Sequence, residues 1–465
     1  MKTKIVATIG PASDNEAILR EMFLAGVSVA RLNFSHGSHA EQRERIRKIR
    51  LTAQLTQKNV AIMLDTKGPE IRVAELKSPR KIQVGESYGL CYQDYRGPEE
   101  AIPVTYQGIA KDVNTGDRIL IDDGNISLLV TDKKEDLVIC KAENSGEILS
   151  RKGVNLPGRE VNLPALTEKD KEDLLLGIAE KVDFIAASFI RNASHVREIK
   201  SFLAAHNGDI PVIAKIESRS GIAALEEIIA VADGLMVARG DLGVEIPLAE
   251  VPLVQKKMIA LCNYYGKPVI TATQMLESMT VNPRPTRAEV SDVANAILDG
   301  TDAVMLSGES AAGKYPLGAV KTMAKIAQAT ESQIDTAKFR QNTQKPNLTG
   351  AIGMAAVKLA EDTGAKAILI PTTSGETARM IARFRPVTPL AVTSPQEVTC
   401  RRLALTWGVE CRLQEYGQDY DQTIANAITT AKSHSLLQDK DLAIITAGAP
   451  LGNSSKTSSL VAIEV

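Results

Sequence analysis

Eight short runs of apolar and β-branched residues recur through the first two-thirds of the chain, and they constrain its fold more than any other feature. Seven of the intervals that follow these runs hold a helix-patterned segment, for example Asn15–Ala25 and Ala40–Gln54. Eight β/α units favour a closed (β/α)8 TIM barrel over an open doubly wound sheet, with its chemistry at the carboxyl ends of the strands. The runs are Lys4–Ile9, Val27–Asn33, Val60–Asp65, Asp183–Phe189, Val212–Glu217, Leu235–Ala238, Pro268–Thr273 and Ala303–Leu306.

The interval after the third run is far too long for one helix and has a different pattern. Short strands alternate there with Gly/Asp turns, as in Asp117–Ile126, and helix signals are scarce. We therefore expect a small β domain, residues 69–163, inserted into a barrel made of residues 1–68 and 164–335. It leaves and returns beside the third strand, so it can close over the barrel edge as a lid, with Lys152 at a basic tip.

A third domain follows the barrel. Polar residues around Gln341–Asn347 predict a linker. Strands are predicted near Ala367–Ile370, Leu390–Val392, Ala443–Thr446 and Leu460–Ile463, alternating with helical segments, which indicates an α/β domain over residues 345–465. The first of these strands leads into Pro371–Arg379, where hydroxyls and a glycine precede a helix. Such a loop is typical of a phosphate nest, although a plain capped turn has the same pattern.

Charge and cysteine content exclude several classes of function. The net charge of −1 over 465 residues provides no basic field for nucleic acid. The five cysteines are scattered without zinc-site spacing, which favours a reduced compartment. No apolar run is long enough to cross a membrane or to serve as a signal peptide. We expect a cytoplasmic protein that binds neither nucleic acid nor membrane.

The stretch Pro211–Gly243 predicts a metal site. Lys215 and Glu217 stand two residues apart at the end of one strand, so both point to the same side. One helix is predicted between this strand and the next, which ends at Asp241. If the two strands are adjacent, Glu217 and Asp241 meet at one edge, and hard carboxylates without His or Cys suit Mg²⁺ or Mn²⁺. The alternative is an ordinary ion pair beside a helix cap.

Other strand ends carry polar residues that fit an anionic substrate. Arg31 and Arg72 can neutralise phosphate oxygens, and Thr273 can hydrogen-bond substrate. The residues Asn33, Ser35, Asp65 and Thr66 offer oxygens for a second cation. In Arg239–Gly243, Gly240 allows close backbone approach. Each residue taken singly is also compatible with a role confined to its own loop.

With these pieces placed, the chain resembles the pyruvate kinase family over essentially its whole length. Seven motifs in the family's order carry the resemblance. They are Ala30–Gly37 (ARLNFSHG), Leu64–Arg72 (LDTKGPEIR), Lys152–Gly158 (KGVNLPG), Ala214–Glu217 (AKIE), Val237–Gly243 (VARGDLG), Ala272–Met279 (ATQMLESM) and Pro285–Glu289 (PTRAE).

The resemblance implies transfer of a phosphoryl group from phosphoenolpyruvate to ADP, giving pyruvate and ATP, in an allosteric enzyme that is usually a homotetramer. It also implies a small β-barrel as the lid and a K⁺ dependence marked by Glu70. Carried over by motif, Glu217 and Asp241 are the implied Mg²⁺ ligands, and the implied K⁺ ligands are Asn33, Ser35, Asp65 and Thr66. The implied phosphoenolpyruvate contacts are Arg31, Lys215, Gly240, Asp241 and Thr273, of which Lys215, Arg31 and Thr273 are also catalytic. The implied nucleotide contacts are His36, Arg72 and Lys152, and the implied contacts of a phosphorylated effector are Thr372, Thr373, Ser374, Gly375 and Thr377.

Two other functions compete with this one. An Mg²⁺-dependent aldolase or lyase acting on pyruvate enolate also pairs a Glu and an Asp on a metal in a barrel, but it leaves the inserted domain unexplained. A non-catalytic sensor of phosphorylated metabolites is the second alternative, although every expected active-site residue is present. The effector's identity stays open among a sugar bisphosphate, a sugar monophosphate and AMP.

Overall fold

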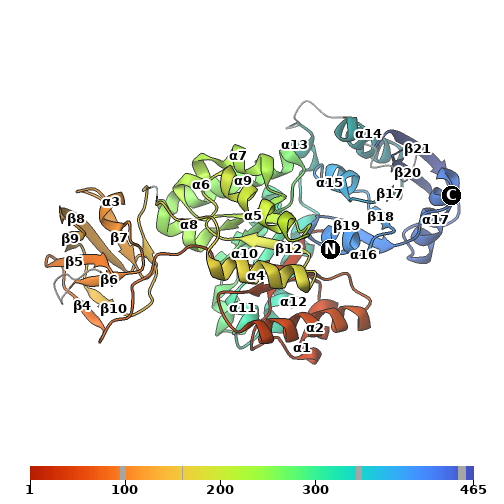
Figure 1. The fold of residues 1–465 in the computed structure, drawn as a ribbon. Helices are drawn as coiled ribbons and strands as arrows, with labels where there is room; N and C mark the ends of the chain where they lie inside the picture. The colour runs from red at the N-terminus through yellow and green to blue at the C-terminus, as the bar shows by residue number, and fades with distance from the viewer. Residues whose placement is uncertain (95–100, 160, 342–347, 449–456) are drawn as a thin grey trace.

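The computed structural model describes residues 1–94, 101–159, 161–341, 348–448 and 457–465. Figure 1 shows three regions in a row: a small β domain at the left, a central barrel surrounded by helices, and an α/β domain at the right that contains the carboxyl terminus. The order of regions along the molecule therefore differs from their order in sequence, because the small β domain interrupts the barrel.

The eight predicted runs form a closed, all-parallel barrel, in the order β1-β16-β15-β14-β13-β12-β3-β2. This confirms the predicted barrel. Its strands are β1 (Lys4–Thr8), β2 (Val27–Asn33), β3 (Ala61–Asp65), β12 (Phe184–Ala187), β13 (Val212–Ile216), β14 (Gly234–Ala238), β15 (Val269–Ala272) and β16 (Ala303–Leu306).

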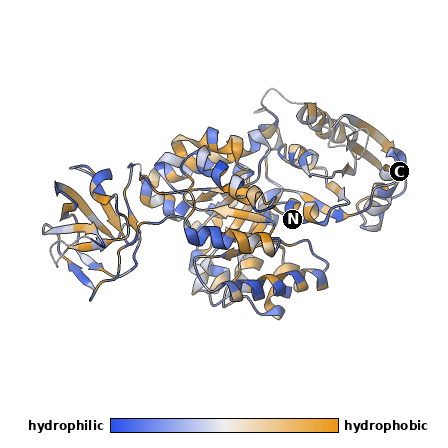
Figure 2. Ribbon diagram, viewed as in Figure 1, coloured by the Kyte–Doolittle hydropathy of each residue, from blue (hydrophilic) through white to orange (hydrophobic). Residues whose placement is uncertain are grey.

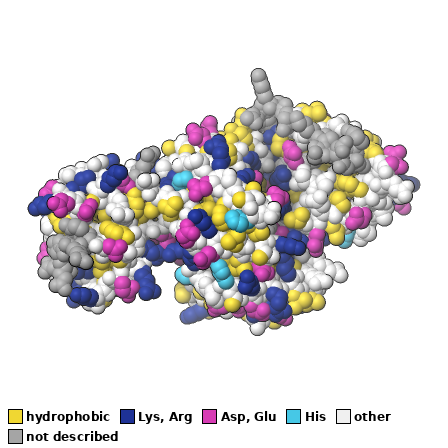
Figure 3. All heavy atoms as spheres, viewed as in Figure 1, with side chains coloured by type: hydrophobic (Ala, Val, Ile, Leu, Met, Phe, Trp, Pro, Cys, Tyr) yellow, Lys and Arg dark blue, Asp and Glu magenta, His cyan; other side chains and the backbone are white. Residues whose placement is uncertain are grey.

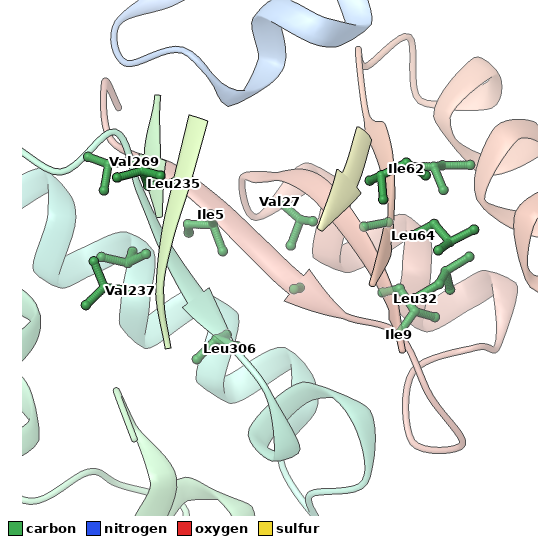
Figure 4. Close-up of a cluster of buried hydrophobic side chains, with 14 of the residues drawn as sticks. Ile5, Ile9, Val27, Leu32, Ile62, Leu64, Leu235, Val237, Val269 and Leu306 are labelled. Carbon is green, nitrogen blue, oxygen red and sulfur yellow. The ribbon is translucent and has the colours of Figure 1, made fainter. Parts of the chain in front are cut away.

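Alternate residues of these strands enter two separate apolar layers, as strand periodicity requires. One set packs with the surrounding helices; Figure 4 shows part of it, including the register partners Leu32 and Leu64. The other set, which includes Val6, Met63 and Met236, fills the barrel interior. Figure 2 shows the barrel strands as predominantly hydrophobic and the outer helices as mixed.

Helices surround the barrel, and their starts follow the expected capping chemistry. Capping boxes are present at Thr167 with Asp170 and at Thr286 with Glu289. The helices are α1 (Glu16–Leu24), α2 (His39–Leu55), α4 (Glu168–Ala179), α5 (Ala193–Ala205), α6 (Arg219–Ala223), α7 (Leu225–Val231), α8 (Arg239–Glu245), α9 (Val251–Tyr265), α10 (Arg287–Asp299), α11 (Gly308–Ala311), α12 (Pro316–Glu331) and α13 (Thr336–Gln341), with 3₁₀ turns η1 (Leu248–Glu250) and η2 (Glu277–Thr280).

One prediction about these helices was wrong. A single helix was expected between β13 and β14, but the chain forms two, α6 and α7, separated at Ala224. The ψ of 15° at Ala224 departs from helical values and turns the chain between them. The sequence holds no proline there, so only the local backbone geometry reveals the break.

The inserted domain consists of a six-stranded sheet in the order β11-β7-β8-β9-β5-β6 and a two-stranded sheet of β10 and β4. Isolated bridges join Arg72 to Gly153, beside β11, and Val73 to Val104, in β6. The chain at 72–73 thus links both edges of the larger sheet, which gives the domain its barrel-like form. Its elements are β4 (Arg80–Ile82), β5 (Ser87–Tyr92), β6 (Ile102–Val104), α3 (Ile109–Asp112), β7 (Arg118–Ile121), β8 (Ile126–Lys134), β9 (Leu137–Ala142), β10 (Gly146–Ile148) and β11 (Val154–Asn155).

The carboxyl-terminal domain has a five-stranded sheet in the order β19-β18-β17-β20-β21. Four of its strands were predicted, and β19 was missed. The predicted linker lies outside the described residues except for Gln341, which ends α13. The elements are α14 (Leu348–Thr363), β17 (Ala367–Pro371), α15 (Glu376–Ala382), β18 (Leu390–Ser394), α16 (Glu397–Arg402), η3 (Leu403–Leu405), β19 (Val409–Leu413), α17 (Tyr420–Ser433), β20 (Leu442–Ala447) and β21 (Ser459–Glu464).

This domain is attached to the amino-terminal end of the barrel. Ala404 and Leu405, from η3, pack with the interior residues of the barrel. Arg385, only 1% exposed, donates to Asp302 at 3.1 Å and to Asn263 Oδ1 at 2.7 Å. The carboxyl-terminal end of the barrel is left to the inserted domain. Among the described residues, no helix combines the length and apolarity that a membrane crossing requires.

Candidate active site

The predicted site residues come from the carboxyl ends of five barrel strands. Arg31 and Asp65 stand at the ends of β2 and β3, and Lys215 is the fourth residue of β13. Asp241 lies in the first turn of α8, directly after β14, and Thr273 follows β15. Since the strands are parallel neighbours, these side chains reach one rim.

Lys215 is the centre of a buried network of charges. Its Nζ lies 2.9 Å from Glu217 Oε1, 3.2 Å from Asp65 Oδ1 and 2.7 Å from Ser188 Oγ. Arg31 contacts the other oxygen of Asp65 at 2.6 Å and donates to Thr8 Oγ1 at 2.9 Å. The ion pair of Lys215 and Glu217, which the sequence left as an alternative to a metal site, is therefore present inside a larger cluster.

The electrostatics of this cluster favour a charged Lys215 and a charged Asp65. Burial alone would lower the pKa of Lys215, but Asp65 and Glu217 hold it above its usual value. Burial alone would raise the pKa of Asp65, yet Arg31 and Lys215 hold it below its usual range. The rim therefore presents fixed positive charge in a water-poor environment.

Glu217 and Asp241 behave differently, because burial outweighs the attraction of Lys215 in both groups and raises their pKa values. Burial raises the pKa of Glu217 to about 7 in spite of Lys215, and Asp241 contributes to the rise. Burial also raises the pKa of Asp241, with help from Asp123 and Glu70 of the inserted domain. Two buried carboxylates that repel each other are stabilised by a shared cation.

The donor set fits Mg²⁺ or Mn²⁺. Both groups supply hard oxygen, and Glu217 is 2% exposed with Oε2 already oriented by the backbone N–H of Phe189 at 2.5 Å. Among the described residues, no three His, Cys, Asp or Glu side chains gather as a metal-binding group. One or two carboxylates suffice for Mg²⁺ when substrate and water complete the shell.

Thr273 is held in an unusual conformation at the rim. Its φ is 63° and that of Gln274 is 55°, a left-handed geometry that is rare for a β-branched residue. The Thr273 hydroxyl accepts from Gly240 N at 2.9 Å and donates to Ala272 O at 2.7 Å. A Cβ on Gly240 would meet Thr273 only at an ordinary contact of 3.6 Å, so protein packing alone does not require glycine there.

Arg239 holds this strained turn in place. Its guanidinium donates to the carbonyls of Ala272 at 3.2 Å and Thr273 at 2.5 Å. Asp292 of α10 accepts from Nη1 with both oxygens, at 2.7 and 2.6 Å. Arg239 is thus a positioning residue for Thr273 rather than a free cation.

The four residues expected to hold a second cation gather at the ends of β2 and β3. Asn33 and Asp65 are register partners, and Asn33 Oδ1 accepts from Ser35 N at 3.0 Å. Thr66 follows Asp65, and its hydroxyl accepts from Ser188 N at 3.2 Å. The set supplies oxygen only, which suits an alkali-metal or hard divalent cation.

A cleft of about 320 Å³ lies between the rim and the inserted domain. Glu217 and Asp241 line it from the barrel side, and Arg72 and Lys152 line it from the other. Arg72 pairs with Glu70 at 2.5 Å, and Lys152 pairs with Asp122 at 2.8 Å. Figure 3 shows the surface indented between the left lobe and the barrel. His36 is exposed on the loop after β2, outside the residues that line this cleft.

The predicted effector loop joins β17 to α15. Gly375 has a φ of 76° and caps α15, while its N–H donates to Thr372 Oγ1 at 3.0 Å. The Thr373 hydroxyl contacts Tyr416 OH at 3.2 Å, and the Thr377 hydroxyl contacts Thr457 Oγ1 at 2.6 Å. The loop is therefore a well-bonded turn rich in hydroxyls, and Ser374 at its tip is exposed.

Three contributors to the site were missed from the sequence. Ser188 follows β12 and contacts Lys215, and the rule that polar groups at strand ends face the site would have found it. Phe189 contributes a backbone N–H, for which no side-chain signal exists. Arg239 was read only as part of a motif, because its partner Asp292 is 53 residues away.

The fold and the rim together define an enzyme of the (β/α)8 class that is built for an anionic substrate and a divalent cation. Comparisons with known proteins then identify the family. Residues 1–320 match the family model for the pyruvate kinase barrel domain, and residues 350–463 match that for the pyruvate kinase alpha/beta domain. The chain therefore belongs to the pyruvate kinase family, which consists of phosphotransferases.

Full-length relatives agree with this assignment. Pyruvate kinases of Geobacillus stearothermophilus and Sporosarcina psychrophila are 50% and 49% identical over 463 residues, covering 98% of this chain and 79% of each relative. A crystal structure of a pyruvate kinase from Cryptosporidium parvum superposes with a TM-score of 0.95 at 39% identity, covering 100% of this chain and 96% of that one.

Proposed function

We propose that the carboxyl rim of this barrel transfers the phosphoryl group of phosphoenolpyruvate to ADP, with Glu217 and Asp241 as ligands of Mg²⁺. The observation that carries this proposal is the buried contact of Lys215 with Asp65, Ser188 and Glu217, beside Asp241, whose pKa is raised by burial. Membership in the family supports the reaction. Mg²⁺, when bound, would neutralise phosphate charge and align the reacting groups.

In the proposed reaction the bond between the enol oxygen and phosphorus breaks, and an ADP oxygen forms the new bond. Lys215 and Arg31 stabilise the charge on the phosphoryl oxygens and on the enolate oxygen left behind. Both cations are fixed beforehand by Asp65, so little reorganisation accompanies the transfer. The enolate then takes a proton at carbon to become pyruvate.

Thr273 is proposed to orient the water or proton that completes this second step. Its strained backbone and its bond from Gly240 N place the hydroxyl at the rim. A Cβ on Gly240 would make only ordinary contacts, so the protein leaves open space beside this residue. We assign that space to the substrate carboxylate. Gly240→Ala should raise KM for phosphoenolpyruvate with no change in melting temperature; an unchanged KM would remove this role.

The nucleotide is proposed to occupy the cleft under the inserted domain. Arg72 and Lys152 line that cleft and would exchange their pairs with Glu70 and Asp122 for phosphate oxygens. His36 is proposed as a further contact from its exposed loop. Potassium is proposed at Asn33, Ser35, Asp65 and Thr66, whose oxygens gather beside Arg31.

One coupled assay tests the proposal. Pyruvate release from phosphoenolpyruvate should require ADP and Mg²⁺ together and should increase with K⁺. Carbon–carbon bond cleavage without ADP would indicate the aldolase or lyase alternative instead. Binding of phosphoenolpyruvate without turnover under any of these conditions would indicate a sensor.

We further propose that the loop Thr372–Thr377 binds the phosphate of an allosteric effector and that the enzyme is a homotetramer. Support comes from the hydroxyls and the glycine cap of the loop, with Ser374 exposed at its tip. Ser374→Asp should abolish activation by sugar phosphates or AMP through charge repulsion, whereas Ser374→Ala should only weaken it. Full activation of Ser374→Asp would refute the effector site, and light scattering tests the tetramer separately.

A further inference from the structure

Two of the five cysteines lie in contact within the carboxyl-terminal domain. Cys400 belongs to α16 and Cys411 to β19, and their Sγ atoms are 2.9 Å apart. Both are free thiols, and they are 1% and 4% exposed. A disulfide bond is about 2.0 Å long, so the two sulfur atoms need to approach by only roughly 1 Å to form one. The two elements that carry them already pack against each other.

The surroundings of the two thiols make them chemically unequal. The hydrogen bond with Cys411 lowers the pKa of Cys400, and the charges of Arg401 and Arg412 add to this effect. The same hydrogen bond, together with burial, raises the pKa of Cys411. Burial also raises the pKa values of the three remaining thiols, which belong to Cys91, Cys140 and Cys262. Because the thiolate is the reactive form of cysteine, Cys400 is the nucleophile of the pair.

A cavity of about 370 Å³ gives access to this pair. Cys400 and Cys411 line it from the carboxyl-terminal domain, and the start of the chain lines it from the barrel; Figure 1 shows the amino terminus beside α16 and β19. The charged residues of its lining are Lys2, Lys4, Lys58, Glu410 and Arg412. The excess of cations favours a thiolate, and the volume is several times that of a water molecule, so a small hydroperoxide has room to approach.

The chain between the two cysteines attaches the carboxyl-terminal domain to the barrel. We call its residues Leu403–Trp407 the docking segment. Ala404 and Leu405 of this segment pack with the residues of the barrel interior. The backbone N–H of Trp407 donates to Asp302 Oδ1 at 3.2 Å, directly before β16. A bond between the sulfur atoms at positions 400 and 411 would therefore close a covalent loop around the docking segment.

We propose that Cys400 and Cys411 form a reversible disulfide when a hydroperoxide enters this cavity, and that the bond restrains the docking segment. The Cys400 thiolate attacks the O–O bond. Its sulfur keeps one oxygen as a sulfenic acid, and the other oxygen leaves and takes a proton from solvent, giving an alcohol or water. The Cys411 sulfur then attacks the Cys400 sulfur, and the hydroxyl leaves with the Cys411 proton as water.

The electrons balance in this sequence. The two sulfur atoms together lose two electrons, which the peroxide gains, and a thiol reductant restores both thiols by exchange. The pair contacts none of the residues that line the rim of the barrel, so the proposal does not rest on the proposed function.

Mapping the thiols of the full chain tests the proposal. Reduced protein is exposed to hydrogen peroxide, denatured, alkylated and digested with trypsin. Arg401 and Arg402 lie between the two cysteines, so the two peptides stay joined only through a disulfide. Wild type should yield the joined peptides, with Cys400 reacting at least about tenfold faster than Cys91, and dithiothreitol should separate them. Peptides that stay separate while the other thiols oxidise would overturn the proposal.

Two variants separate a paired role from that of a single reactive thiol. In Cys411→Ser, oxidation of Cys400 should stop at the sulfenic acid, which dimedone labels, whereas the matched control Cys91→Ser should keep the disulfide. The midpoint of thermal unfolding should rise by a few degrees when wild type or Cys91→Ser is oxidised, and not when Cys411→Ser is. No rise in wild type, or an equal rise in Cys411→Ser, would overturn the restraint of the docking segment. If Cys411→Ser does not fold, the peptide map of wild type still decides whether the disulfide forms.

Discussion

The two ends of the barrel use similar charged residues in opposite ways. At the amino end, Asp302 and Arg385 form a two-point ion pair at 3.1 Å, and Arg385 also stacks on Trp407 at 5.2 Å. At the carboxyl end, Asp65 is matched by Arg31 and Lys215, but burial raises the pKa values of Glu217 and Asp241 in spite of Lys215. The paired charges at the amino end join two domains, whereas the two buried carboxyls with raised pKa values at the carboxyl end mark a place where a cation is expected.

The largest expected effect follows from removing Arg385 at the amino end of the barrel. Arg385→Ala leaves Asp302 buried without its partner, which typically costs about 3–5 kcal/mol of stability. Arg412→Ala removes an exposed pair with Glu410 and should cost about 0–1 kcal/mol. Urea unfolding followed by circular dichroism measures both. Equal unfolding midpoints for the two variants would show that the Arg385 pair is not what joins the domains.

At the other end of the barrel, losing Lys215 should damage chemistry more than folding. Lys215→Met should lower kcat by about 10²–10³, equivalent to about 2.7–4 kcal/mol of transition-state stabilisation, while binding of Mg²⁺ persists. Lys256→Met, at an exposed ion pair, is the matched control and should turn over normally. Steady-state kinetics with a separate metal titration checks this, and near-normal turnover of Lys215→Met would count against the proposed role.

The fold was predictable because its signal is local. Seven of the eight barrel strands are short, completely buried runs, so their apolar composition predicts them directly. The strand β19 was missed because it is an edge strand in which Glu410 and Leu413 are exposed, which weakens the apolar pattern. The break between α6 and α7 was not predicted, because no proline and no change in composition marks it in the sequence.

The site was predictable to the extent that strand topology brings residues together. Adjacent parallel strands place Lys215, Glu217 and Asp241 at one rim, and this followed from sequence alone. The contacts of Ser188 with Lys215 and of Arg239 with Asp292 depend on packing between segments far apart in the chain. The left-handed backbone of Thr273 is a tertiary effect, which residue type argues against.

The smallest expected effect concerns the pH dependence of Mg²⁺ affinity at Glu217. With a raised pKa of about 7, metal-free Glu217 holds a proton below that pH, and a bound cation must displace it. Affinity for Mg²⁺ should fall about tenfold per unit as the pH drops below about 7, and should level off above it. Glu245→Gln removes another carboxyl whose pKa is raised by burial and should leave the profile unchanged. An affinity independent of pH across this range would contradict the assignment.

Titration with Mn²⁺, monitored by the paramagnetic signal of the free ion, tests whether Glu217 and Asp241 hold a divalent cation. We expect one saturable site in the parent protein and in Glu245→Gln. Glu217→Gln and Asp241→Asn should each lose binding over the concentrations that saturate the parent, although both remain folded. Unchanged Mn²⁺ affinity in these two variants would contradict this role.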